Sequence, residues 1–130
     1  MVLVVDDCVD MGRVLVRLLR RFGVDSTFVA SGQGAIDFLH DNVPSLMILD
    51  VMMPGLGGFD VLKLVRADPK LGTLPIVMYS ALSDTESQNE AVRLGASDYM
   101  VKGRIDYEGL KAVVEKHTIE ANARGIPVLS

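Results

Sequence analysis

The sequence predicts an α/β protein in which helices cover both faces of a doubly wound, five-stranded parallel sheet. Short apolar runs alternate regularly with amphipathic stretches, which is typical of repeated strand–helix units. The apolar runs at 2–6, 45–50 and 74–79 are almost uninterrupted, as expected of strands buried on both faces. A length of 130 residues accommodates one domain with a substantial core.

The first half of the chain contains three of the expected strands. The run at 2–6 is the first strand, and the helix at 9–22 has its apolar side chains on one face. Strand 25–30 mixes polar and apolar residues and is expected at an edge of the sheet; helix 32–41 and strand 45–50 complete this half. The face of the first helix opposite its apolar side carries arginines, namely Arg13, Arg17, Arg20 and Arg21.

The second half repeats the pattern. Helix 57–67 follows a loop rich in glycine and proline, and strand 74–79 is again apolar. Helix 84–93 leads to strand 97–101, which is expected at the other edge, and helix 106–121 ends the domain. Residues beyond this helix are expected to form a tail or the stump of a linker.

The helix at 84–93 carries boundary signals. Ser83 and Glu86 have the spacing of a capping box at its start. Gly95 follows its last periodic residues, as a glycine does when it ends a helix in the left-handed conformation.

Composition excludes several classes of protein. Hydrophobic residues make up 49% of the chain and charged residues 23%, as in globular proteins. No apolar run approaches the roughly 20 residues of a membrane span, and no signal peptide is expected at the start. Cys8 is the only cysteine, which fits a cytoplasmic location. The net charge of −4 argues against a nucleic-acid surface.

Polar groups follow four of the apolar runs. Asp6 and Asp7, Asp50, Ser80 and Lys102 each stand at the end of an expected strand. Because the carboxyl ends of parallel strands meet at one edge of a sheet, these five side chains are expected to converge there. Three carboxylates without a nearby histidine or cysteine favour a hard cation, and Mg²⁺ is the natural candidate.

This set of residues suits phosphoryl transfer. Asp50 is the candidate nucleophile, because carboxylates can form aspartyl-phosphates. Transfer depends mainly on positioning and on neutralising the phosphoryl oxygens. Mg²⁺ and the Lys102 ammonium would each neutralise one oxygen, and the Ser80 hydroxyl would donate a hydrogen bond to another.

From Val2 to about Ala121 the chain resembles the receiver domain of two-component response regulators, whose stand-alone form is the chemotaxis response regulator. The residues that carry the resemblance are Asp6 and Asp7, Asp50 with Met53-Pro54-Gly55 and Gly58-Phe59, Ser80-Ala81, and Asp98-Tyr99 with Lys102. The resemblance implies strand order 2-1-3-4-5 in a flavodoxin-like three-layer α/β/α sandwich. It also implies a receiver domain at 1–121 and a tail at 122–130.

The resemblance implies a role for each site residue. Asp50 would be the phosphoacceptor. The ligands of Mg²⁺ would be Asp6, Asp7, Asp50 and the backbone carbonyl of Met52. The groups in contact with the phosphoryl group would be Ser80, the backbone of Ala81, and Lys102. Ser80 and Tyr99 would form the switch that responds to phosphorylation, although the residues alone equally allow Tyr99 to be a half-buried packing residue of an edge strand.

Partners are implied in the same way. The phosphoryl donor would be a sensor histidine kinase or a histidine phosphotransfer protein. Arg17 and Arg20 are candidate contacts for it, although a solvated helix face is the simpler interpretation of these arginines. A downstream protein or domain would bind the face formed by 84–121. Direct binding of nucleic acid and insertion into a membrane are not expected, and both a monomer and a homodimer stay open.

The chain departs from the family pattern at two positions. Relatives usually carry a proline after the lysine, joined by a cis peptide, where this chain has Gly103. We expect either a trans Lys102–Gly103 bond with a remodelled loop or a strained cis bond. Met52 stands where many relatives have a polar side chain, and it predicts slow loss of the phosphoryl group.

Three alternatives were weighed. Phosphohydrolases with an aspartyl nucleophile typically place a second aspartate two residues later, where Met52 cannot donate a proton. A flavodoxin-like electron carrier would need a phosphate-binding first loop, in which Asp6 and Asp7 would repel a flavin phosphate. A degenerate receiver that acts only as a binding surface stays open because of Gly103.

Three further side chains are not expected to take part in the site. Cys8 is expected to be a small packing residue, since nearby carboxylates disfavour a reactive thiolate. His40 and His117 lie in helical patterns without a paired ligand, so both are expected at the surface.

Overall fold

The computed structural model describes residues 1–123, with side chains as far as residue 118. Its strands are β1 (Val2–Val5), β2 (Ser26–Val29), β3 (Leu46–Asp50), β4 (Ile76–Ser80) and β5 (Asp98–Val101). Its helices are α1 (Val9–Arg21), α2 (Gly32–Asp41), α3 (Gly58–Ala67), α4 (Thr85–Arg93), the 3₁₀ turn η1 (Lys102–Arg104) and α5 (Tyr107–Ala123). Each expected strand and helix is present, with bounds shifted by one or two residues.

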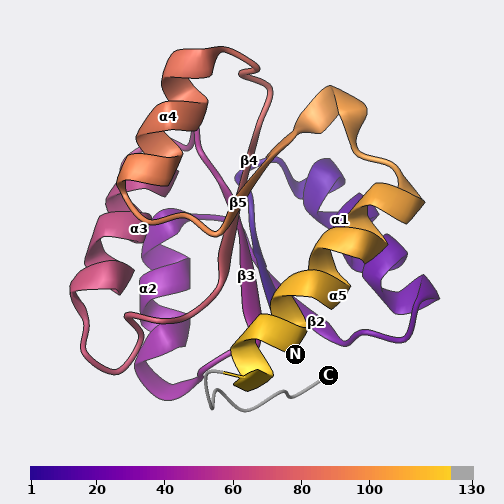
Figure 1. Ribbon diagram of the computed structural model, residues 1–130, viewed down its shortest axis with the longest axis horizontal. Coiled ribbons are helices and arrows are strands. Elements are labelled where there is room, and N and C mark those ends of the chain that lie inside the picture. Colours follow the sequence, from indigo (N-terminus) through magenta and orange to yellow (C-terminus); the bar gives the residue numbers. More distant parts are fainter. Residues whose placement is uncertain (124–130) are drawn as a thin grey trace.

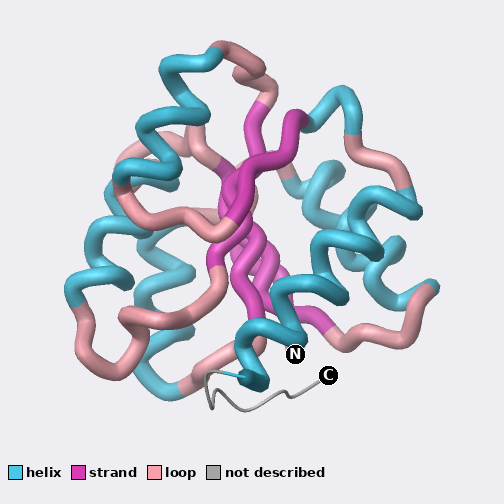
Figure 2. Tube along the Cα trace, viewed as in Figure 1, coloured by secondary structure: helices cyan, strands magenta, loops and turns pink. Residues whose placement is uncertain are grey.

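The strands form one parallel sheet in the order β2-β1-β3-β4-β5. β2 and β5 are its edges, as expected from the mixed composition of β2 and from the placing of β5 at the other edge. Helices α1 and α5 cover one face of the sheet, and α2, α3 and α4 cover the other (Figures 1 and 2). The doubly wound three-layer sandwich is therefore confirmed.

Alternating side chains of the buried strands divide the core between the two faces. The cluster on the α2 and α3 side includes Leu3, Val5, Met47, Leu49, Ile76 and Met78. The cluster on the α1 and α5 side includes Val2, Val4, Leu46, Ile48, Val77 and Tyr79. Every residue of β1, β3 and β4 is buried, so the hydrophobic effect orders these strands and their ends.

Several local expectations were wrong. Asp84 caps α4 and accepts a hydrogen bond from the backbone of Ser87, so the capping box at Ser83 does not form. His117 is buried, with Nε2 3.2 Å from an Asp98 carboxylate oxygen. Cys8 is exposed. Gly95 does take the left-handed conformation after α4 (φ +93°), as predicted.

Two further findings concern membrane spans and the end of the domain. Within residues 1–123, no helix is long and apolar enough to cross a membrane. The predicted tail at 122–130 overlaps the end of α5, which runs to Ala123; residues 124–130 lie outside the described part.

Candidate functional site

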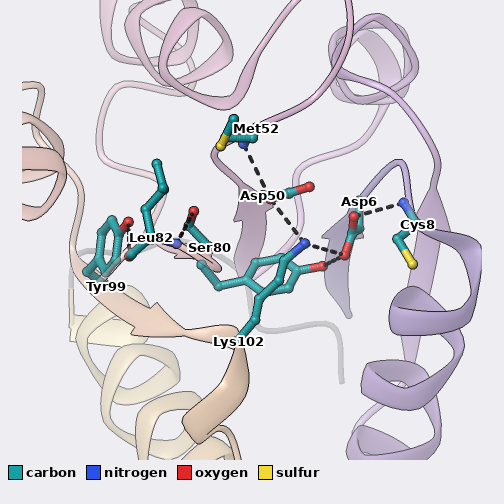
Figure 3. A network of polar contacts seen from close by, with 9 residues as sticks. Asp6, Cys8, Asp50, Met52, Ser80, Leu82, Tyr99 and Lys102 are labelled. Carbon is teal, nitrogen blue, oxygen red and sulfur yellow. Dashed lines mark hydrogen bonds and ion pairs between the residues drawn. The ribbon is translucent and has the colours of Figure 1, made fainter. Parts of the chain in front are cut away.

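The carboxyl edge of the sheet brings the predicted side chains together (Figure 3). Strands β3 and β4 are paired so that Asp50 lies opposite Tyr79, and β4 and β5 so that Ser80 lies opposite Val101. Asp6 follows β1, the other neighbour of β3, and Lys102 follows β5. Parallel pairing therefore places groups that are distant in sequence at one edge.

Asp6 is fully buried and held by hydrogen bonds to both of its oxygens. Its Oδ1 accepts from the backbone N–H of Cys8 at 2.9 Å, and its Oδ2 accepts from the Tyr79 hydroxyl. Burial alone would raise the pKa of Asp6, but these hydrogen bonds, together with the neighbouring Asp50 and Lys102 side chains, hold the pKa below its usual value. Asp6 is therefore an oriented carboxylate.

Asp50 is also buried, but it is less well satisfied. Its Oδ1 accepts a long hydrogen bond from the backbone N–H of Met52, at 3.4 Å. Its Oδ2 is buried and has no hydrogen-bond partner. Burial, together with the adjacent Asp6 carboxylate, raises the pKa of Asp50 to about 7. A buried oxygen without a partner is costly, so this atom is suited to receive a ligand.

The acidic cluster could hold a metal ion. Asp7 is exposed, and it offers a carboxylate oxygen that lies with oxygens of Asp6 and Asp50 within 4.8 Å of one another. Oxygen ligands of this kind suit a hard divalent cation. The donor set, together with the partnerless Oδ2 of Asp50, therefore fits such an ion.

Lys102 bridges the two buried carboxylates. Its Nζ lies 3.2 Å from Oδ2 of Asp6 and 3.3 Å from Oδ1 of Asp50. The ammonium also lies 4.9 Å from the centre of the Tyr79 ring, within range of a cation–π interaction. Burial would lower the pKa of Lys102, but the two carboxylates raise it above its usual value. The lysine therefore carries its charge in the site.

The Lys102–Gly103 bond is trans, because no peptide bond of the described residues is cis. The chain turns here through η1. Of the two outcomes expected for the Lys102–Gly103 bond, the trans form is the one found. The loop nevertheless leaves the ammonium in contact with both carboxylates.

The predicted switch residues meet at the loop after β4. The Ser80 Oγ is buried and accepts a hydrogen bond from the backbone N–H of Leu82, at 3.0 Å. The Tyr99 hydroxyl donates to the carbonyl of Leu82, at 2.9 Å. One residue of this loop thus links the serine to the tyrosine, as Figure 3 shows. Ala81, between Ser80 and Leu82, is exposed.

Helix α3 begins directly against the backbone of Asp50. A Cβ atom added to Gly58 would lie 2.0 Å from the Asp50 carbonyl oxygen and 2.8 Å from Cα of Val51. The Gly58 N–H donates to the Val51 carbonyl at 2.9 Å. The absence of a side chain at Gly58 therefore allows the loop after β3 to fold back beside the site.

One site residue was missed by the sequence analysis. Tyr79 was assigned to the apolar run of β4, yet its hydroxyl reaches Asp6 at the centre of the site. A signal was present, because a buried tyrosine hydroxyl usually needs a hydrogen-bond partner. No such partner could be identified from the local sequence.

Comparison with known proteins decides the family. The family model of the response regulator receiver domain matches residues 2–115. The chain belongs to this family. It is 37% identical over 101 residues to "Protein RcaC" of Microchaete diplosiphon and to "DNA-binding response regulator MtrA" of Mycolicibacterium paratuberculosis. These matches cover 78% of the chain but only 16% and 44% of the two relatives, so the receiver domain spans less than half of their length.

Solved structures agree with the family. A putative response regulator from Chloroflexus aurantiacus superposes with a TM-score of 0.86 at 32% identity, covering 91% of this chain and 96% of that one. Chemotaxis protein CheY4 of Vibrio cholerae superposes with a TM-score of 0.82 at 27% identity, covering 88% and 95%. The chain is thus a two-component receiver domain with the fold of a chemotaxis response regulator.

Proposed function

We propose that this receiver domain accepts a phosphoryl group on Asp50 in the presence of Mg²⁺. The buried Oδ2 of Asp50, which has no partner, supports the proposal most directly. It lies in a carboxylate that is flanked by the acidic cluster and by the Lys102 ammonium. The donor is a phosphohistidine of a sensor histidine kinase or of a phosphotransfer protein, and the domain acts in the cytoplasm.

The chain's own residues supply positioning and charge. Asp50 forms an O–P bond as the N–P bond to the donor's histidine breaks. Mg²⁺ would be held by Asp6, Asp7, Asp50 and the carbonyl of Met52, and it would neutralise negative charge on the phosphoryl group. Lys102 moves from the carboxylates to a phosphoryl oxygen, as suits a flexible point charge.

Phosphorylation then shifts the domain between two states. The Ser80 hydroxyl and the backbone of Ala81 contact the phosphoryl group. Movement of Ser80 breaks its bond to Leu82, which also holds the Tyr99 hydroxyl. The Tyr99 side chain therefore moves with Ser80. The surface formed by 84–121 changes as a result, and with it the affinity of this surface for a downstream partner. That partner is a protein or protein domain, because the net charge of −4 disfavours direct contact of this domain with nucleic acid.

A small phosphodonor tests this function against the hydrolase alternative. With acetyl phosphate and Mg²⁺, we expect labelling that stops at one phosphoryl group per chain and that requires the metal. Continuous release of phosphate over many turnovers would instead support a hydrolase. If acetyl phosphate labels the protein neither with Mg²⁺ nor without it, the result would support a degenerate receiver.

Affinity for Mg²⁺ is expected to increase with pH up to about 8. The pKa of Asp50 is raised to about 7, so the side chain must release its proton before it can bind a cation. Below that pKa the affinity should fall about tenfold per pH unit, and above it the affinity should level off. Calorimetric titration over a pH series measures this. An Asp50→Asn control should lose the steep dependence, and a pH-independent affinity in the wild type would contradict the assignment.

The lifetime of the phosphoryl group is expected to shorten several-fold in Met52→Asn. The Met52 side chain is 61% exposed beside Asp50, where an apolar group cannot orient an attacking water molecule. Decay of radiolabelled protein after removal of the donor measures the lifetime. Leu64→Asn, at an exposed apolar position of α3, is the matched control. Equal lifetimes in wild type and Met52→Asn would remove the proposed role of Met52.

A further inference from the structure

Tyr79 places a phenol where the acidic site meets the core. Its ring is completely buried on the α1 and α5 side of the sheet, in the cluster that contains Val4 and Ile48. Its hydroxyl donates to Oδ2 of Asp6, although the two residues are 73 positions apart in sequence. Strand pairing of β1, β3 and β4 fixes this distance, because each of these strands is buried along its whole length.

We propose that Tyr79 is a positioning residue that holds Asp6 in the orientation needed to bind Mg²⁺. The inference rests on the proposed magnesium site, but it concerns a residue outside the set of ligands. Tyr79 touches neither the cation nor the phosphoryl group. It acts through the carboxylate of Asp6, as outer groups do when they orient a ligand of a metal site.

The other contacts of Asp6 show why the phenol matters. Lys102 also contacts Oδ2 of Asp6, but in the proposed reaction its ammonium leaves to meet the phosphoryl group. The Cys8 N–H holds only Oδ1. Once Lys102 has moved, the Tyr79 hydroxyl still donates its hydrogen bond to Oδ2. Tyr79 is a buried residue of β4 and has little freedom to move, so the Asp6 carboxylate keeps its orientation during the proposed transfer.

The ring of Tyr79 also contacts the other charged group of the site. It lies beneath the Lys102 ammonium, with 4.9 Å between Nζ and the ring centre. Lys102 is followed by Gly103, which has no side chain to pack beside the lysine. Tyr79 therefore contacts both the Lys102 ammonium, through its ring, and the Asp6 carboxylate, through its hydroxyl.

The test compares Mg²⁺ affinity in wild type, Tyr79→Phe, Asp6→Asn and the double variant. Tyr79→Phe removes only the hydroxyl and keeps the buried ring. Calorimetric titration is expected to show Mg²⁺ binding about 10-fold to 100-fold weaker in Tyr79→Phe, as for other outer groups of metal sites. In the Asp6→Asn background the same change should have little further effect, because Tyr79 acts through Asp6.

Tyr107→Phe is the matched control, since it removes a hydroxyl on α5, where the ring packs against Phe22. It should leave the affinity unchanged. Urea unfolding of each variant separates an effect on folding from an effect on the site. A role in stability alone would weaken folding of Tyr79→Phe while Mg²⁺ affinity stays at the wild-type value, and that result would overturn the inference.

Two other outcomes would also overturn it. A loss of affinity on Tyr79→Phe that is equally large in the Asp6→Asn background would show that Tyr79 does not act through Asp6. If wild-type protein binds no Mg²⁺ at all, the proposed function fails and the inference fails with it. If the wild type binds Mg²⁺ and Tyr79→Phe binds it equally well, the role of Tyr79 is overturned but the proposed function is not.

Discussion

Replacing Gly58 with alanine is expected to lower the free energy of unfolding by about 3 kcal/mol or more. The added Cβ would lie 2.0 Å from the Asp50 carbonyl oxygen and 2.8 Å from Cα of Val51. Both contacts are with backbone atoms, which cannot move aside as the end of a flexible side chain can. Urea unfolding of Gly58→Ala and wild type measures the difference.

Gly103→Ala is the matched control for this substitution. Its new Cβ would meet no atom within 4 Å, and its backbone is not in the left-handed region. Alanine there should leave stability unchanged or raise it by up to about 1 kcal/mol. Equal stability of Gly58→Ala and wild type would show that α3 does not press against Asp50 as described.

Replacing Lys102 with methionine is expected to slow labelling of Asp50 by acetyl phosphate about 100-fold. Methionine keeps an unbranched side chain of similar length but removes the charge. The ammonium lies 3.3 Å from Asp50, the carboxylate that receives the phosphoryl group, so the proposed reaction loses a stabilising charge at its centre. Rates of labelling at saturating Mg²⁺ measure the effect.

Lys63→Met provides the control, because Lys63 is exposed on α3. It should label at the wild-type rate. Labelling of Lys102→Met at the wild-type rate would mean that the lysine does not assist transfer.

The sheet and most of the site could be predicted because they depend on simple patterns. Almost uninterrupted apolar runs identified β1, β3 and β4 as buried strands, and mixed composition identified β2 as an edge, which left β5 for the other edge. Parallel strands bring their carboxyl ends to one edge, so Asp6, Asp50 and Lys102 were expected to meet. Their ion pairs confirm that expectation.

Features that depend on distant partners could not be predicted in the same way. The acceptor of the Tyr79 hydroxyl lies 73 positions away, and the partner of the buried His117 lies 19 positions away. Without those partners, a tyrosine in an apolar run and a histidine in a helix looked ordinary. The predicted cap of α4 was wrong for a local reason, because the neighbouring residues Ser83 and Asp84 are both of types that cap helices.

The measurement that tests the central claim most directly is the intact mass of the protein after incubation with acetyl phosphate and Mg²⁺. The account predicts one added phosphoryl group on the wild type and none on Asp50→Asn. An equal adduct on Asp50→Asn, or no adduct on a folded wild type that binds Mg²⁺, would contradict the claim that Asp50 is the phosphoacceptor.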